Sequence, residues 1–326
     1  MKIQKPLLAN LLALTMILTS VFSFFSCEGA TNDGKKTYTV GICQLTKHDA
    51  LDAATQGFQD ALKKELGEAN VTFDLQNASN DIPLCTTIVN AFVSKKVDLI
   101  LANATPALQA AYSATDQIPI LGTSVTEYGV ALGLNDFKGT VGGNVSGTSD
   151  LAPLTEQADM LLSLFPEARK VGLLYCSAEP NSDYQIKVIG DYLTEKGVTC
   201  TPYSFSDSND VISVTTKAAA DSDVIYIPTD NTAASCSEII GGIVREKKVP
   251  VIAGEAGICK GCGVATLSIS YYDLGYKTGL MAARILRGES DISAMPIEYA
   301  PATKMYNPDV CADLGIIPPE GYKPLG

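Results

Sequence analysis

The sequence has few of the residues that most catalytic and metal sites require. It contains one histidine, His48, and one closely spaced cysteine pair, Cys259 and Cys262. A single CxxC pair without a second pair or a nearby histidine is a weak zinc motif, so we predict free thiols or a local disulfide there and no metal. His48 would need a nucleophile to act as a catalytic base, and no GxSxG motif stands near the predicted strand ends. We therefore do not expect an enzyme.

Motifs for phosphate recognition are also missing. No GxGxxG and no GxxxxGK[ST] sequence follows a predicted strand, which argues against a nucleotide cofactor. The net charge is −12, and no cluster of lysine or arginine offsets it. An acidic surface repels the phosphate backbone, so we predict no nucleic-acid partner. No cofactor of any kind is expected.

The N-terminal segment has the pattern of an export signal. Two lysines precede an uncharged, apolar run over residues 6–25, and Cys27 follows a small serine. We predict a lipoprotein signal peptide over residues 1–26, lipidation of Cys27 and a polar tether over residues 27–37. The alternative is an uncleaved membrane anchor, because the run is nearly long enough to span a bilayer. Both interpretations place the remaining chain outside the cytoplasmic membrane.

The rest of the chain contains an internal repeat. Segment 169–181 has a residue pattern similar to that of segment 38–50, and segment 222–234 a pattern similar to that of segment 97–109. Each half alternates short apolar strands with helical patterns, which predicts parallel βαβ units with both sheet faces covered. The predicted fold class is α/β, with two doubly wound parallel-sheet lobes joined by a multi-strand hinge. Lobe 1 is predicted to contain residues 38–145 and 273–295, and lobe 2 residues 146–272 and 296–326.

The ends of corresponding strands carry different chemistry in the two halves. Ligands bind at the carboxyl ends of strands in open parallel sheets, and a cleft between two lobes is a favoured small-molecule site. The first half places hydroxyl groups there, and the second half places carboxylates. Thr105 corresponds to Asp230, and Ser124 corresponds to Glu255. Thr126 is a further hydroxyl in the first half.

This polarity suits a zwitterion. Thr105 fits an N-cap and Pro106 the first helical position, and the free N–H groups of a helix start attract anions. Asp230 and Glu255 suit a cation on the opposite wall. Capping is the alternative role for Thr105 and Asp230, whereas Glu255 is expected in a loop with no helix to cap. Further candidates at strand ends and at a predicted crossover are Gln44, His48, Asn181, Ser182, Asn231 and Tyr271. For Asn181 and Ser182, capping and ligand contact stay open.

Several motifs in order resemble a known family. "GICQLTKHDALDAATQGFQDAL", "DLILANATPALQAA", "IPILGTSVTE", "YIPTDNTAAS", "VPVIAGEAG" and "GVATLSISYYDLGYKTGLMAARILRGE" together resemble the ABC transporter substrate-binding lipoproteins of the tryptophan/tyrosine type. The resemblance runs from about residue 38 to the end. It implies a type I periplasmic-binding-protein fold and delivery of a captured solute to a membrane permease driven by a separate ATPase. It also implies that hydroxyls of lobe 1 hold a ligand carboxylate and that Glu255 helps to hold its ammonium group.

We therefore predict a monomeric, extracytoplasmic, lipid-anchored receptor for an aromatic or other apolar amino acid, with an ABC permease as partner. Departures from the family pattern at Asp49 and Glu127 leave the ligand's identity open. A rival hypothesis is an exported ligand-sensing domain that signals to a membrane partner. A further rival is an enzyme that uses His48 or the Cys259/Cys262 pair.

Overall fold

The computed structural model describes residues 36–326. The predicted signal peptide, Cys27 and nearly all of the predicted tether lie outside the described residues. Within the part of the chain that is described, no helix is both long and apolar enough to cross a membrane.

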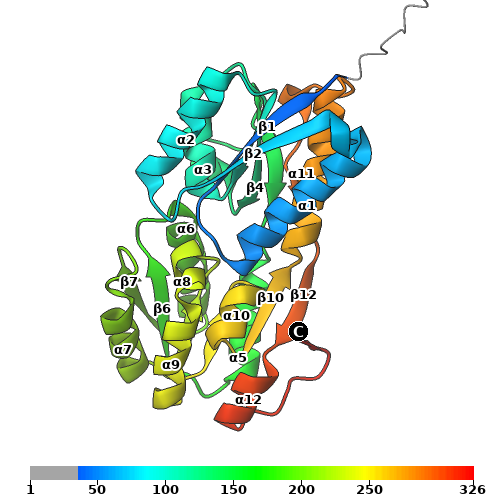
Figure 1. Ribbon diagram of the computed structural model, residues 1–326. Helices are drawn as coiled ribbons and strands as arrows, with labels where there is room; N and C mark the ends of the chain where they lie inside the picture. Colours follow the sequence, from blue (N-terminus) through cyan, green and yellow to red (C-terminus); the bar gives the residue numbers. More distant parts are fainter. Residues whose placement is uncertain (1–35) are drawn as a thin grey trace, which may run out of the picture. The chain divides into compact units, whose positions relative to one another are not determined.

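Two sheets organise the chain, and helices cover both faces of each (Figure 1). The first has the strand order β11-β5-β4-β3-β1-β2, and the second has the order β13-β12-β10-β9-β8-β6-β7. Among the pairings of the described strands, β10 with β12 is antiparallel and the others are parallel. The predicted α/β class with two doubly wound lobes is confirmed, and lobe 1 contains the first sheet.

The elements up to the first crossing between sheets are β1 (Tyr38–Gln44), α1 (Asp49–Leu66), η1 (Glu68–Asn70), β2 (Val71–Asn77), α2 (Ile82–Lys95), β3 (Leu99–Asn103), α3 (Thr105–Ala114), β4 (Ile120–Val125), α4 (Tyr128–Leu132) and β5 (Val145–Ser149). The second sheet and its helices are built from α5 (Leu154–Leu164), β6 (Lys170–Cys176), α6 (Pro180–Glu195), β7 (Thr199–Phe205), α7 (Val211–Asp221), β8 (Val224–Ile227), α8 (Asn231–Ser235), α9 (Ser237–Lys247), β9 (Val251–Ala253), α10 (Ala256–Cys262) and β10 (Ala265–Ile269). The chain ends with α11 (Tyr271–Leu286), η2 (Ile292–Ala294), β11 (Glu298–Tyr299), β12 (Ala302–Tyr306), α12 (Pro308–Leu314) and β13 (Lys323–Pro324).

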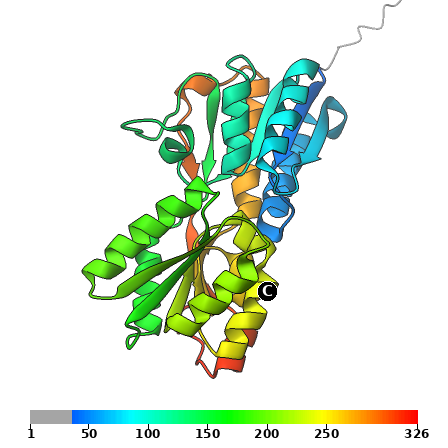
Figure 2. The same cartoon turned by 90° about the vertical axis from the view of Figure 1, so that its left-hand side faces the viewer.

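The central strands are apolar on both faces, as buried parallel strands must be. All five residues of β3 and all four of β8 are buried. On lobe 1, α1 and α11 cover one face of the sheet, and α2, α3 and α4 cover the other. On lobe 2, α5, α6 and α12 lie opposite α7 to α10. Each sheet therefore sits between two helical layers, and only its strand ends face the other lobe (Figure 2).

The chain passes between the sheets three times. It leaves the first sheet after Ser149, returns at Tyr271 where α11 begins, and leaves again after Tyr299. These switches lie a few residues from the expected boundaries at 145, 273 and 295. The difference arises because β5 and β11 pair with each other at the edge of the first sheet. Three crossing segments allow two lobes to rotate about a hinge.

Three helix starts differ from the predictions. Thr105 is not an N-cap but the first residue of α3, because Ala104 occupies the cap position with φ 101°. Pro106 is therefore the second helical residue, and not the first as was predicted. Asn181 and Ser182 lie inside the first turn of α6, which begins at Pro180. Proline at the first helical position is favourable because its missing N–H would be unpaired there anyway.

Glu255 was expected in a loop, and that expectation is wrong. It directly precedes α10, a seven-residue helix over Ala256–Cys262. The helix was hard to predict because two of its residues are glycines, which have low helix propensity.

Candidate functional site

The ends of the strands in the two lobes face each other and are already in contact. The His48 Nε2 atom lies 3.3 Å from the Asn231 Oδ1 atom, which joins the tip of β1 to the start of α8. Asn80 donates a hydrogen bond of 3.1 Å to the Thr232 hydroxyl. The structure thus brings two of the predicted site residues, His48 and Asn231, together across the boundary between the lobes.

The wall of lobe 1 is strained and has an unused polar group. Ser124 and Ala104 both have positive φ, at 53° and 101°, a region that non-glycine residues rarely adopt. Such strain gathers at functional sites, where surrounding structure holds it in place. The Ser124 hydroxyl is buried and has no hydrogen-bond partner among the described residues.

The start of α3 lies on the same wall. Ala104 has no side chain that could cap the helix, so the first N–H groups receive no capping acceptor. Thr105 and Pro106, both buried, form the first turn. A helix start without a side-chain cap, close in the sheet to the free hydroxyl of Ser124, makes this wall suitable for a carboxylate.

Asp230 is a helix cap with a saturated carboxylate. Its Oδ1 atom accepts from the backbone N–H of Ala233 at 2.7 Å. Its Oδ2 atom accepts from the N–H of Cys176 at 2.6 Å and from the Ser182 hydroxyl at 2.8 Å. Burial, and then the neighbouring Glu179, raise the pKa of Asp230 to about 8.

Glu179 closes the same helix start from the other side. Its carboxylate accepts from the backbone N–H groups of Asn231 and Thr232, and also from both of their side chains. Asp230 and Glu179 therefore share the five-residue helix α8, and Ser182 completes this network instead of facing a cleft.

Glu255 is also a cap. Its carboxylate accepts from the N–H of Gly257 at 2.7 Å and from the N–H of Ile258. Burial raises the pKa of Glu255, and the nearby His48 opposes this shift. Short helices need such acceptors because their N-terminal N–H groups have no partners within the helix. Both acids that the sequence pointed to are thus engaged in local structure.

The acid that sequence reasoning missed is Asp150, which follows β5 on the first crossing segment. It is 3% exposed, and its Oδ2 atom accepts from the Tyr271 hydroxyl at 2.9 Å. Its Oδ1 atom has no partner among the described residues. Burial is the main cause that raises the pKa of Asp150 to about 6, while Tyr271 and Thr126 hydrogen bonds oppose it. The sequence could have indicated this acid, because an aspartate follows the buried strand in "VSGTSD" just as one follows the strand in "VIYIPTD".

Two other predicted site residues, Asn181 and Gln44, have different surroundings. Asn181 donates to the Thr229 carbonyl at 3.2 Å, and its buried Oδ1 atom has no partner among residues 36–326. Gln44 does not belong to this group. Its amide donates to Asp52 at 2.7 Å and accepts from Thr55 at 2.6 Å, so the side chain is fixed against α1.

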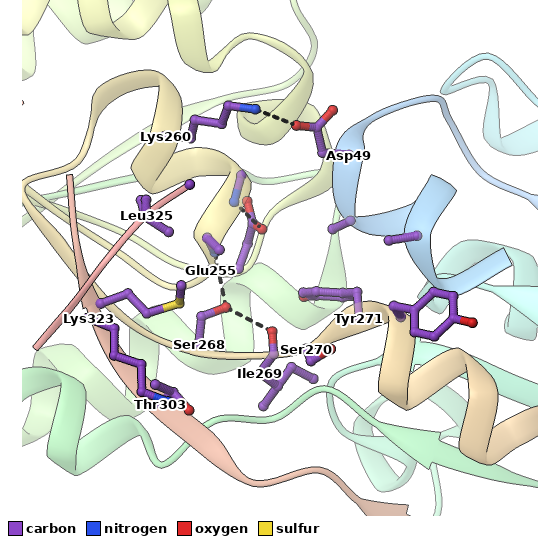
Figure 3. A pocket seen from close by; sticks show the side chains of 17 residues that line it. Asp49, Glu255, Lys260, Ser268, Ile269, Ser270, Tyr271, Thr303, Lys323 and Leu325 are labelled. Carbon is purple, nitrogen blue, oxygen red and sulfur yellow. Dashed lines mark hydrogen bonds and ion pairs between the residues drawn. The ribbon is translucent and has the colours of Figure 1, made fainter. Parts of the chain in front are cut away.

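A cavity of about 500 Å³ adjoins these residues at the hinge (Figure 3). Glu255, Ser268 and Tyr271 border it, and the Lys260–Asp49 ion pair, at 3.3 Å, bridges the lobes beside it (Figure 3). Its volume lies within the range of small-molecule pockets. None of the six residues whose buried polar side-chain atoms lack a partner within residues 36–326 lines it, so we assign polar recognition to the strand ends and regard the cavity as an adjoining space.

The candidate catalytic groups have ordinary structural roles. Burial raises the pKa of the Cys259 thiol, which favours the neutral form and lowers its reactivity. Cys259 and Cys262 are free thiols on α10, and the Cys262 thiol contacts the Ile258 carbonyl. No group of three or more metal-ligating side chains occurs within residues 36–326.

Two doubly wound lobes, three crossing segments and polar groups gathered between the lobes define a type I periplasmic-binding-protein fold. The profile of the ABC transporter substrate binding protein family matches residues 39–322. The chain belongs to this family, as the sequence motifs predicted. Since its members are substrate-binding proteins, the prediction that the chain is not an enzyme is confirmed.

Individual relatives support the assignment. A tyrosine-binding protein of Clostridioides difficile (strain R20291) is 36% identical over 309 residues, which are 93% of this chain and 89% of that protein. The structure of an ABC domain from Streptococcus pneumoniae in complex with L-Trp has a TM-score of 0.83 and 29% identity, and the match covers 87% of this chain and 97% of that one. A ligand-free, open structure of a substrate-binding protein with adhesive properties from Clostridium difficile has a TM-score of 0.68 and 38% identity. The match covers 88% of this chain and 99% of that one.

Proposed function

We propose that this protein is the extracytoplasmic receptor of an ABC importer, and that it captures a zwitterionic amino acid with an aromatic or other apolar side chain between its lobes. One observation carries the proposal. Six buried polar side-chain atoms have no partner among the described residues, and three of them, Ser124 Oγ, Asp150 Oδ1 and Asn181 Oδ1, come from lobe 1, the first crossing segment and lobe 2 respectively. The other three belong to Asn103, Thr215 and Thr266. Buried polar groups are normally hydrogen-bonded, so we propose that the first three atoms bind the ligand.

The arrangement of the lobes supports the proposal. The relative with higher sequence identity, solved in an open form, has the lower TM-score, and the L-Trp complex has the higher one. Rotation of one lobe against the other lowers a TM-score although each lobe keeps its fold. Contacts such as His48–Asn231 fit a closed arrangement, which a bound solute stabilises.

The relatives indicate the ligand class. One is named for tyrosine and another was solved with L-Trp. We propose that residues 38–326 are held at the outer face of the cell membrane through Cys27, and that a membrane permease receives the solute. A micromolar site corresponds to about 8 kcal/mol, which a few charge-assisted hydrogen bonds and burial of an aromatic side chain can supply.

Mass spectrometry of the compound released from the purified protein tests the proposal, followed by calorimetry with that compound. We expect an aromatic or apolar amino acid, with a dissociation constant of about 1 μM or lower. Release of a sugar, or the absence of heat with L-tyrosine, L-tryptophan, L-phenylalanine and L-leucine, would contradict it.

A further inference from the structure

One oxygen of the Asp150 carboxylate is hydrogen-bonded and the other is free, and no Lys, Arg or His within residues 36–326 forms an ion pair with it. One of its oxygens accepts from Tyr271, and the other has no partner among the described residues. Glu255, which also acts electrostatically on Asp150, is acidic too. A buried carboxylate with a free oxygen is stabilised by a positive group.

We infer that Asp150, oriented by Tyr271, holds the protonated amino group of the ligand, whereas Asp230 and Glu255 mainly stabilise helix starts. The inference rests on the proposed function and names the specificity-determining residue of that site. It revises the sequence-based expectation, which gave this role to Asp230 and Glu255.

The hydrogen bonds of the other two acids support this division. Asp230 accepts three hydrogen bonds from N–H and O–H groups of its own lobe. Glu255 accepts from two backbone N–H groups at the start of α10. Each would have to give up part of a helix cap to turn toward a ligand, and such caps contribute about 1 kcal/mol each. Asp150 loses nothing, since its free oxygen has no competing donor.

The position of Asp150 links recognition to closure. Asp150 lies on the first crossing segment, and Tyr271 begins α11 after the second. An ammonium group on Asp150 therefore contacts the hinge itself. The predicted ligands carry a primary ammonium beside a carboxylate, which excludes sugars and deaminated acids.

The first test uses the unaltered protein and two probes, L-tyrosine and 3-(4-hydroxyphenyl)propionate, which differ only by the amino group. Calorimetry should show at least 100-fold weaker binding of the deaminated probe. Because no substitution is involved, this measurement does not depend on how any variant folds. Equal affinity for both probes would overturn the inference.

The second test uses Asp150→Asn, which keeps the shape of the side chain and removes its charge. We expect L-tyrosine affinity to fall at least 100-fold and affinity for the deaminated probe to change less than threefold. Asp191→Asn is the control, because Asp191 is exposed and paired with Lys187 on α6, and both affinities should stay as in the unaltered protein. A general loss of structure would weaken both probes alike, which the comparison detects.

The results of these tests distinguish failure of the proposed function from failure of the role of Asp150. If the unaltered protein binds no amino acid, the proposed function fails and the role of Asp150 fails with it. If it binds L-tyrosine and Asp150→Asn binds equally well, the role of Asp150 alone is refuted. The same holds if Glu255→Gln, and not Asp150→Asn, abolishes discrimination between the probes. A crystal structure with L-tyrosine should place the amino nitrogen within about 3.2 Å of Asp150 Oδ1.

Discussion

Asp150, Glu179, Asp230 and Glu255 are four carboxylates with almost no exposure to solvent. Three of them accept backbone N–H groups at the starts of α8 and α10, so their oxygens are engaged in helix caps. Asp150 lies after a strand that no helix follows directly, so it caps no helix. The same residue type at the same kind of position therefore has a different role, and the following helix decides which.

Because burial raises the pKa of Asp150, the stability of the protein should depend on pH. Its pKa is about 6 in the folded protein, above the ordinary value of 3.8. Between these values the folded state binds the proton more tightly, so the free energy of unfolding of the unliganded protein should decrease as pH rises from about 4 to about 6. The loss attributable to Asp150 is at most about 3 kcal/mol. The groups that face it are Tyr271, Thr126 and Glu255.

Urea unfolding of the unliganded protein and of Asp150→Asn at pH 4.5 and 7.5 checks this prediction. We expect the variant to be more stable than the unaltered protein at pH 7.5, and this advantage to shrink at pH 4.5. Buried acids that do not interact with Asp150 contribute equally to both proteins and cancel in the difference, whereas removing the charge of Asp150 also favours ionisation of Glu255. A stability difference that is the same at both pH values would contradict the prediction.

Helices α1 and α11 illustrate how elements are joined in this fold. They come from opposite ends of the described chain and pack directly on each other (Figure 1). Glycines permit the close approach, because a Cβ atom on Gly275 would overlap the Ala54 carbonyl and one on Gly57 would overlap the Tyr272 carbonyl. Backbone atoms cannot move aside as a flexible side chain can. This contact attaches the returning helix α11 to lobe 1 and so fixes one crossing segment.

Gly275→Ala should therefore reduce the free energy of unfolding by about 3 kcal/mol, since overpacking forces backbone shifts. Gly242→Ala is the matched control. Gly242 also lies inside a helix, and no atom stands within 4 Å of the Cβ position. There the substitution should increase stability by about 0.5–1 kcal/mol through helix propensity. Urea unfolding of both variants measures the difference, and equal effects would show that the α1–α11 contact tolerates a methyl group.

Besides the crossing segments, side chains of the two lobes contact each other directly. The Lys260–Asp49 ion pair and the His48–Asn231 hydrogen bond span the boundary near the mouth of the cavity. Both side chains of the ion pair are largely exposed, at 60% and 76%. Exposed pairs contribute roughly 0–1 kcal/mol and weaken with salt, so they can bias closure without locking it.

Lys260→Ala should speed ligand dissociation by roughly two- to fivefold at low ionic strength, because it removes a contact made only when the lobes are closed. The effect should decrease as salt is added. Lys187→Ala is the control, since Lys187 pairs with Asp191 within one helix. Stopped-flow measurement of the dissociation rate of the bound amino acid separates the two. Identical rates in both variants would refute a role for the ion pair in closure.

Much of the architecture could be predicted from the sequence, because periodic patterns report local structure directly. The strands around Gly41 and Gly172 and the internal repeat led to two parallel sheets, and the motifs led to the family. The site was less predictable. Asp230 was correctly seen as a possible cap, but Glu255 was placed in a loop because the glycines of α10 obscure its helical pattern.

By itself the sequence determined the fold class, the repeat, the family and the polar strand ends, since these depend on residue order and spacing. Only the tertiary structure decided which acids still have a free oxygen. That property depends on donors from distant segments, such as the Cys176 N–H on Asp230 and the Tyr271 hydroxyl on Asp150. Whether a carboxylate oxygen is hydrogen-bonded depends on which donors lie near it in space, and the order of residues in the sequence does not show this.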